Sequence, residues 1–311
     1  MAVVGTPRPR AAERNATRRR GRYGESVLLP LLFVGPHLIL FLLFAVFATL
    51  LGFWISLHKF DYLQRIHLFV GPRNYQHLLL KPGNLFHDEF IPTMIGAFTF
   101  VVTVVPALVI LGLLLANLLN TKVRARGFWR TCYVLPWPLT GTVVSLIWYF
   151  IFQGPDEGVV NLWLKALRQP QVSFESDPLW GTLIVLGRSV WWQLGFNIIV
   201  LLAGLQTVSR SLYEAAQVDG AGAVGRFRHV TLPGIKPMLL FALLVDLIGA
   251  FVGFGGAGSE GGSASPVVSL IWNTGWQMDN MGMAATMSFV FGALIVVLSL
   301  VLFRFFFTER A

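Results

Sequence analysis

Charged residues are scarce in this sequence, because only 13% of its 311 residues are Asp, Glu, Lys or Arg. A soluble globular domain carries about 25% charged residues, so the composition argues against a soluble fold. Cysteine is almost absent as well. The one thiol, Cys132, has no second cysteine with which to form an intramolecular disulfide, and we interpret it as a small apolar side chain within a span.

Sequence motifs of catalysis are also missing. The G-x-x-x-x-G-K-[ST] loop that cradles phosphate in ATPases does not occur. The six histidines are scattered without the helical spacing of metal ligands, and no nucleophile motif stands out. These absences predict a chain that holds no cofactor or metal and catalyses no reaction itself.

What the sequence has instead is long apolar runs, and 55% of its residues are hydrophobic. A run of roughly 18 or more apolar residues is typical of a bilayer-spanning helix, because about 20 residues are needed to cross the hydrocarbon. The runs predict an all-α polytopic membrane protein with six transmembrane helices. These helices lie at about residues 27–57, 93–119, 131–152, 178–205, 237–256 and 282–307.

The net charge of +9 is concentrated before the first span, which argues for a lipid surface and against nucleic acid as its partner. The basic residues there are Arg8, Arg10, Arg14, Arg18, Arg19, Arg20 and Arg22. Residues 1–26 are therefore predicted to be a basic cytoplasmic tail. The apolar run that follows exceeds the 7–15 residues or so of a signal peptide, so we interpret it as an uncleaved span.

The positive-inside rule sets the orientation of the connections. Two basic connections would be cytoplasmic, 119–130 with Lys122, Arg124, Arg126 and Arg130, and 206–236 with Arg210, Arg226, Arg228 and Lys236. The acidic 153–177 connection and the 257–281 connection, which has no Lys or Arg, would be external. Both termini would then be cytoplasmic. The 58–92 connection fits less well, since it is basic yet must be external.

The second cytoplasmic connection holds a long, position-specific motif, EAAQVDGAGAVGRFRHVTLPGIKP, from Glu214 to Pro237. It resembles the pattern E-A-A-x3-G-x9-I-x-L-P of permease subunits of binding-protein-dependent ABC importers, with Val230 in place of the Ile. Other stretches resemble carbohydrate permeases of the maltose-transporter type, among them FVGPRNYQHLL, RTCYVLPWPLTGTVVSLIWYFIF and NMGMAATMSFVFG. The ending FRFFFTER is similar to that of the first of the two unlike permeases in such transporters.

The resemblance implies a six-helix permease domain over residues 27–311, with a coupling loop at about 206–236 between the fourth and fifth helices. Its short helix would fit a groove on a partner ATPase. The residues that carry this role are Glu214, Ala215, Ala216, Asp219, Gly220, Arg226 and Pro233. Gly220 suits a sharp turn because it has no Cβ penalty at positive φ, and Pro233 ends the helical pattern. A membrane-surface helix is the alternative interpretation of this loop.

The resemblance also implies partners and a place in the cell. The chain would lie in a bacterial inner membrane with a second homologous permease, two cytoplasmic ATPase subunits that bind the ATP, and an extracytoplasmic solute-binding protein. The substrate would be a sugar. One departure limits the comparison, since the stretch FGGAGSEGGSASPVV is shorter than the family's usual loop and lacks its aromatics.

Polar residues within the spans form a second candidate site. An ionisable residue at the bilayer centre costs at least about 2.5–3.5 kcal/mol, so it must face protein or water. Sugar hydroxyls bind amides and carboxylates, and sugar rings stack on aromatic rings. We therefore predict a substrate path of Arg188, Trp192, Gln193, Asn197 and Asp246. Alternatively, Arg188 and Asp246 pair with each other or with the partner permease, and the tryptophans form an interface belt.

Two other functions stay open at this point. The solute could be a polyol or glycerol phosphate, with Arg188 facing the anion. The chain could also be a stand-alone carrier or a membrane-embedded enzyme, although neither internal repeats nor paired catalytic groups are visible in it.

Overall fold

The computed structural model describes residues 28–61, 66–121, 124–174, 176–253 and 265–307. The predicted basic tail at 1–26 lies outside these ranges. So do residues 254–264, which make up most of the stretch FGGAGSEGGSASPVV. The chain divides into two compact units, residues 1–55 and 56–311, each described here by itself.

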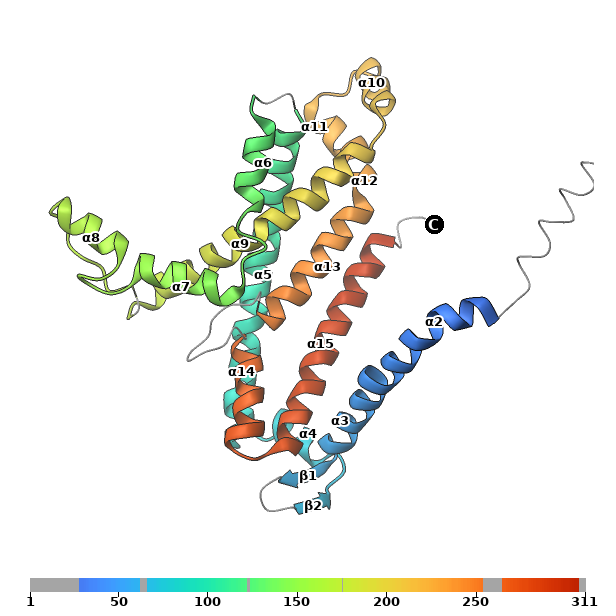
Figure 1. Ribbon diagram of the computed structural model, residues 1–311, viewed down its shortest axis with the longest axis vertical. Coiled ribbons are helices and arrows are strands. Elements are labelled where there is room, and N and C mark those ends of the chain that lie inside the picture. Colours follow the sequence, from blue (N-terminus) through green and yellow to red (C-terminus); the bar gives the residue numbers. More distant parts are fainter. Residues whose placement is uncertain (1–27, 62–65, 122–123, 175, 254–264, 308–311) are drawn as a thin grey trace, which may run out of the picture. The chain divides into compact units, whose positions relative to one another are not determined.

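The described part of the first unit is a run of helix (Figure 1). It consists of α2 (Leu28–Phe41), a π-helical turn (Leu42–Phe47) and most of α3 (Ala48–Ser56). Pro36 lies inside α2 without ending it, as happens in membrane helices, where neighbouring groups satisfy the freed backbone. Residues 32–56 are long and apolar enough to cross a bilayer, at the place where the sequence predicts the first span.

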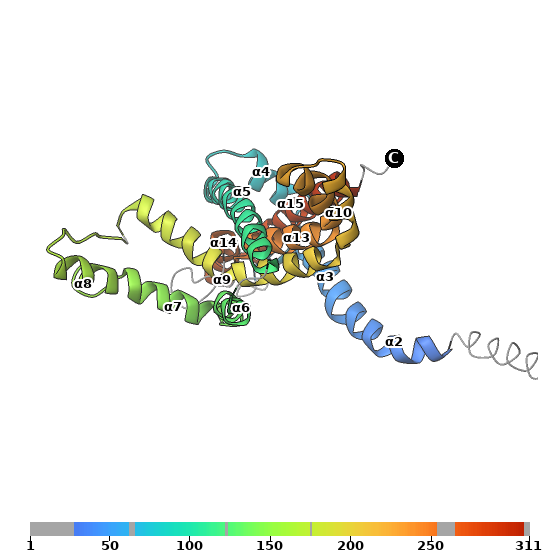
Figure 2. The same ribbon diagram turned by 90° about the horizontal axis from the view of Figure 1, so that it is seen from above.

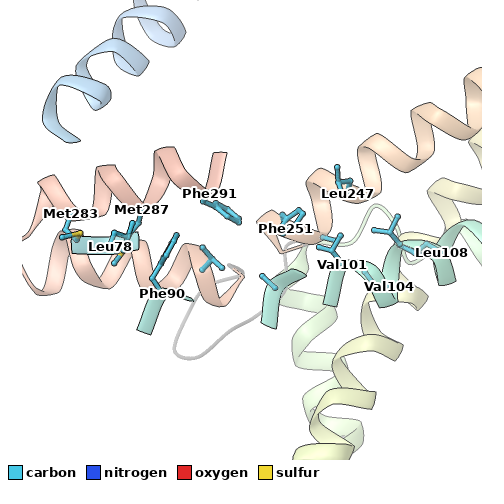
Figure 3. Packing of buried hydrophobic residues seen from close by; sticks show 14 residues of the cluster. Leu78, Phe90, Val101, Val104, Leu108, Leu247, Phe251, Met283, Met287 and Phe291 are labelled. Carbon is cyan, nitrogen blue, oxygen red and sulfur yellow. The ribbon is translucent and has the colours of Figure 1, made fainter. Parts of the chain in front are cut away.

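Four long helices organise the second unit: α5 (Leu85–Asn120), α9 (Pro178–Thr207), α13 (Lys236–Val252) and α15 (Met281–Phe307). Helix α5 packs against α9 and α13, and α13 packs against α9 and α15 (Figure 1). One apolar cluster joins α5, α13 and α15, with Val104, Phe251 and Met287 among its buried members (Figure 3). A second cluster joins α5, α9 and α13 around Leu201.

Local sequence signals explain where these helices begin and end. The side chain of Asn84 accepts a hydrogen bond from the Phe86 N–H (3.0 Å) at the start of α5. Asp177 accepts one from the Leu179 N–H (2.8 Å) at the start of α9, whose first residue is Pro178. Such caps satisfy N–H groups that have no partner within the helix. Helix α13 ends at Gly253, whose φ of 104° is accessible chiefly to glycine.

The predicted continuous helix at 131–152 is wrong. The chain forms α6 (Arg126–Val134), a turn, and α7 (Gly141–Phe152). Pro136 and Pro138 lie in the turn, and proline disfavours a continuing helix because it lacks an N–H and clashes with the preceding turn. With 12 residues, α7 is about 18 Å long, which is shorter than the roughly 30 Å of the hydrocarbon core.

The all-α prediction also needs correction at residues 58–69. Strands β1 (His58–Asp61) and β2 (Ile66–Phe69) pair antiparallel, with His58 opposite Phe69. Helix α4 (Arg73–Leu80) follows. Asn74 Nδ2 donates to the carbonyls of Ser56 (2.8 Å) and His58 (3.0 Å). Because Thr286 on α15 also donates to the Ser56 carbonyl (3.2 Å), the hairpin is fixed to the beginning of α15.

Gly282 lets the hairpin of β1 and β2 approach α15. Substitution of Gly282 therefore tests this packing. A Cβ at Gly282 would overlap the carbonyl oxygen of His58, whereas a Cβ at Gly292 on the same helix meets nothing within 4 Å. We expect Gly282→Ala to destabilise the fold by about 1–3 kcal/mol through overpacking. Gly292→Ala should be neutral or stabilising, since Ala is the better helix former.

Thermal unfolding of the purified protein in one detergent measures both variants. A midpoint for Gly282→Ala equal to that of Gly292→Ala would show that the hairpin does not pack on α15 as described.

The 153–177 connection folds around one buried asparagine. Asn161, on α8 (Val159–Ala166), donates to the carbonyls of Gln153 (3.1 Å) and Val172 (2.9 Å) and accepts from the Val172 N–H (2.9 Å). At the surface, Lys165 donates to Asp156 over 2.5 Å, and this hydrogen bond lowers the pKa of the Asp156 carboxyl.

Among the described residues, four helices are long and apolar enough to span a bilayer. They are 32–56, Leu85–Asn120, Pro178–Thr207 and 281–306. A fifth span results if the bent segment 223–252, which turns by 71° before α13, counts as one. The structure therefore has the character of a polytopic membrane protein.

Candidate functional site

The predicted coupling loop forms a helical hairpin. It contains α10 (Arg210–Val218), α11 (Ala223–Arg226), a π-helical turn (Phe227–Thr231) and α12 (Leu232–Gly234). It stands at one end of α9 and α13 in Figure 1, and Figure 2 shows the same end from above. The turn that the sequence predicts at Gly220 lies between α10 and α11.

Gly220 makes the turn between the two arms. Its φ is 79°, in the left-handed region that costs an L-residue roughly 1–2 kcal/mol. The Gly220 N–H bonds the Gln217 carbonyl (3.1 Å) and the Ala221 N–H bonds the Ala216 carbonyl (2.9 Å), which closes the end of α10. A Cβ at Gly220 would meet nothing within 4 Å, so the need for glycine comes from the backbone alone.

Contacts between the arms and the spans hold the hairpin in place. The hydroxyls of Tyr213 and Thr231 lie 3.0 Å apart and join α10 to the second arm. At the base, a Cβ on Gly234 would come within 2.7 Å of Val208, so the second arm packs directly on the end of α9. Sequence reasoning missed Tyr213, because nothing in the motif pairs it with Thr231.

The hairpin exposes several large apolar side chains among its charged and polar ones. Four large hydrophobic side chains are exposed on it: Leu212 (54%), Val218 (88%), Val224 (79%) and Phe227 (40%). Large apolar side chains left exposed on a protruding hairpin are compatible with an interaction surface.

The predicted coupling residues lie on the same hairpin. Glu214, Ala215, Asp219, Gly220 and Pro233 are exposed, while Ala216 and Arg226 are half-buried. Glu214 accepts a hydrogen bond from Arg210 over 3.0 Å.

The predicted substrate-path residues separate into two groups. Gln193 and Asn197 on α9 meet Asp246 on α13: Asn197 Nδ2 donates to Asp246 Oδ1 over 3.0 Å, and Gln193 Nε2 lies 3.4 Å from the same oxygen. We call these three residues the polar cluster. Asn197 and Asp246 are fully buried and Gln193 is 7% exposed.

The polar cluster also lies close to α5. A Cβ on Gly112 of α5 would come within 2.8 Å of the Asn197 Cβ, so glycine permits the close approach of α5 and α9. In the described part of the chain, Asn197 Oδ1 and Asp246 Oδ2 are buried without a hydrogen-bond partner. Two buried acceptors therefore remain free to receive further donors.

Arg188 and Trp192, also on α9, point elsewhere. Arg188 donates to the Ser145 hydroxyl (3.1 Å) and Trp192 Nε1 donates to the Leu139 carbonyl (3.1 Å). Both partners belong to the segment formed by the turn after α6 and by α7. The alternative in which Arg188 pairs with Asp246 is wrong, because neither is in an ion pair among the described residues.

The remaining predictions concern other groups. Cys132 is exposed on α6 rather than enclosed. Among the residues that the structure describes, no three or more metal-ligating side chains lie together.

Comparison with known proteins gives consistent results along nearly the whole chain. Residues 98–308 match the family model of the binding-protein-dependent transport system inner membrane component. The sn-glycerol-3-phosphate transport system permease protein UgpA of Pectobacterium atrosepticum is 31% identical, over 90% of this chain and 95% of its own. The trehalose/maltose transport system permease protein MalF of Thermococcus litoralis is 30% identical, over 91% and 93%.

Two further similarities complete the comparison. The arabinooligosaccharides transport system permease protein AraP of Halalkalibacterium halodurans is 28% identical, over 89% of this chain and 87% of its own. A chain in a crystal structure of a bacterial ABC transporter that imports the acidic polysaccharide alginate has the same fold, with a TM-score of 0.70 at 22% identity over 96% of this chain and 99% of that one.

The family match covers the coupling loop and the polar cluster together. The chain belongs to the binding-protein-dependent transport system inner membrane components, the permease subunits of ABC transporters.

Proposed function

We propose that this chain is the permease subunit of an ABC importer for a sugar, forming the translocation path and coupling to a partner ATPase through residues 214–233. Its relatives are permease subunits, which decides against a stand-alone carrier or an enzyme, and ATP hydrolysis belongs to a partner chain. The observation that carries the coupling role is the hairpin turned at Gly220, whose exposed apolar surface is joined directly to α9 and α13.

The proposed membrane arrangement keeps six spans. The segment from α6 through α7 is one broken span and the bent segment before α13 leads into the fifth. Residues 1–26 are a cytoplasmic tail, residues 27–311 are the permease domain, and both termini are cytoplasmic. The basic residues of the 119–130 and 206–236 connections support this orientation, because cytoplasmic loops are enriched in Lys and Arg.

The proposed mechanism is alternating access. A solute-binding protein delivers the sugar outside, two ATPase subunits close on ATP inside, and the coupling hairpin passes this movement to the spans of this chain and of a second, homologous permease. The connectivity supports that step, since α9 runs into the hairpin and α13 leaves it. The polar cluster joins the same two helices, so a movement of the hairpin would reach its residues.

The proposed substrate is a sugar, and the predicted path residues remain Arg188, Trp192, Gln193, Asn197 and Asp246. Support comes from relatives named for trehalose/maltose and for arabinooligosaccharides. The free acceptors of Asn197 and Asp246 suit donation by sugar hydroxyls if the helices part during transport.

Glycerol phosphate is the second candidate, favoured by the similarity to a permease for that solute. In that case the half-buried Arg188 is the group expected to face the anion.

Isolation of the tagged chain from its native membrane tests the proposal. We expect a second permease and an ATPase to co-purify, with ATP turnover that rises when a solute-loaded binding protein is added. Uptake into vesicles of labelled maltose, arabinooligosaccharide and glycerol 3-phosphate then separates the two substrate classes. A chain that purifies alone and moves solute without ATP would contradict the importer function.

A further inference from the structure

Two half-buried arginines on α6 each keep one buried nitrogen without a partner among the described residues. The Nε atoms of Arg126 and Arg130 are buried and make no hydrogen bond. The ion pairs found among the described residues, Lys165–Asp156 and Arg210–Glu214, lie elsewhere. Buried polar atoms without partners are rare in native proteins, and each calls for an explanation.

The two arginines lie on the inner face of α6. They are four residues apart, so they share one side of the helix, and Tyr133 continues that side one turn further on. The Tyr133 carbonyl and Val134 Cα would lie within 2.7 and 2.9 Å of a Cβ on Gly195 of α9. Tyr133 also packs on the apolar cluster of α5 and α9. The arginines therefore continue the packed face of α6 toward the helix start.

The sequence around this face supplies no carboxylate. Between Glu89 and Asp156 the chain has no Asp or Glu, and α9 has none either. Helices α6, α9 and nearly all of α5 therefore cannot neutralise the two guanidinium groups.

The beginning of α6 adds further positive charge. No side chain caps this end, where Ala125 adopts a φ of 57°. The first-turn N–H groups of an uncapped helix attract anions, and here they lie at the same end as Arg126. This end of α6 and the coupling hairpin stand at the same end of the second unit (Figure 1).

The outer side of α6 suits a membrane surface. Phe128 (64%), Trp129 (45%) and Leu135 (65%) are exposed on it, and aromatic side chains concentrate at the level of lipid headgroups. Helix α6 begins shortly after the apolar α5 ends at Asn120. Its arginines therefore lie near headgroup depth, beside a surface made for acyl chains.

From this geometry we infer that Arg126 and Arg130 form a site for the phosphate of an anionic phospholipid. The planar guanidinium matches phosphate oxygens in a two-pronged geometry, and basic pockets between membrane helices bind anionic headgroups. The inference rests on the proposed position of α6 at a membrane surface and does not depend on which solute is carried.

The test uses the assembled transporter in nanodiscs of phosphatidylcholine with a minor share of phosphatidylglycerol. Mild delipidation followed by native mass spectrometry counts the retained lipids. A basic residue at a membrane surface contributes about fivefold to the affinity for anionic lipid. The double variant Arg126→Gln with Arg130→Gln should therefore bind phosphatidylglycerol with roughly 30-fold lower affinity and retain correspondingly less of it. Lys at both positions should restore much of it.

The matched control removes two arginines from connections proposed to lie on the external side of the membrane. This variant, Arg73→Gln with Arg168→Gln, changes the net charge equally. It should retain phosphatidylglycerol as the unaltered protein does. Equal loss in this control, or unchanged retention in the Arg126/Arg130 variant, would overturn the site.

Two further measurements distinguish a phospholipid at Arg126 and Arg130 from other occupants. If inorganic phosphate displaces no phosphatidylglycerol, the lipid is the source of the bound group; full displacement would assign the site to free phosphate instead. If the Arg126/Arg130 variant keeps its lipid but loses the second permease or the ATPase, the arginines bind a carboxylate of a partner chain and the inference is wrong. ATP turnover, measured separately, shows whether the proposed transport function holds in either case.

Discussion

Gly220→Val is expected to abolish coupling between this permease and the proposed partner ATPase, while Gly222→Val leaves it largely intact. Gly220 has a φ of 79°, whereas Gly222 has an extended backbone with a φ of −66°. Neither glycine has an atom within 4 Å of a Cβ, so the two variants differ in backbone strain rather than in clashes. A β-branched residue in the left-handed region costs at least the roughly 1–2 kcal/mol of an ordinary residue.

The strain should open the turn rather than unfold the spans. Because the Gly220 and Ala221 N–H groups close the end of α10, a shift of Gly220 to negative φ moves α10 away from α11. We expect ATP turnover stimulated by the binding protein to fall about tenfold or more, the equivalent of at least about 1.4 kcal/mol of lost coupling. Gly220→Asn should be intermediate, since Asn tolerates this region better than other side chains.

Reconstituted transporter gives the measurement, with the thermal midpoint of each variant as a control for folding. If the binding protein stimulates ATP turnover equally in the Gly220→Val and Gly222→Val variants, the turn at Gly220 does not position the hairpin for its partner.

The parts of the fold that the sequence predicts best are those set by one dominant local signal. The helix predicted at 178–205 is observed as Pro178–Thr207, and the one at 282–307 as Met281–Phe307. In both, a long apolar run coincides with a clear boundary, such as the Asp177 cap followed by Pro178. The turn at Gly220 was predictable for a similar reason, since glycine is the residue that adopts positive φ without cost.

The prediction failed where two local signals compete. At 131–152 the apolar run favoured one helix, but Pro136 and Pro138 break it. At 58–69 the strands are only four residues each, which is too short for a recognisable alternation. Packing of Asn74 and Thr286 on the backbone of residues 56–58 holds this hairpin, and such long-range contacts are not visible in sequence.

The candidate sites divide along the same line. Helical spacing correctly placed Gln193 and Asn197 on one face, next to each other in the structure. Their contact with Asp246, and the separate contact of Arg188 with Ser145, join residues more than 40 positions apart. Which polar groups meet across helices depends on how the helices pack, and this is not visible in the sequence.

Exchanging Asn197 and Asp246, the two fully buried members of the polar cluster, is expected to distinguish two roles of the cluster. One role is to join α9 to α13, and the other is to contact sugar. Asn197→Ala removes the 3.0 Å donor to Asp246 and leaves a buried carboxyl with only the 3.4 Å contact of Gln193. A buried group that loses its partner costs about 1–3 kcal/mol, and more when charged. Removal of the packed side chain adds a cavity beside Gly112. We expect a clear drop in thermal midpoint and a loss of most uptake.

The double exchange Asn197→Asp with Asp246→Asn restores an amide opposite a carboxyl at nearly constant volume. If the cluster only joins α9 to α13, the exchange should recover most of both the thermal midpoint and the uptake, giving a favourable coupling energy of about 0.5–3 kcal/mol in a double-mutant cycle. If the cluster also contacts sugar, stability should return but uptake should not, because a hydroxyl would meet the amide and the carboxylate in exchanged positions.

A matched control is Ser189→Ala, which removes a polar group from the same helix. Ser189 is also buried, but its hydroxyl bonds the Val185 carbonyl of its own helix (2.8 Å). This variant should change both readouts little, because the lost bond does not join two helices. If the exchange recovers neither readout while Ser189→Ala is silent, the contact between Asn197 and Asp246 is not what holds α9 to α13. The coupling hairpin would then have to move the two helices separately.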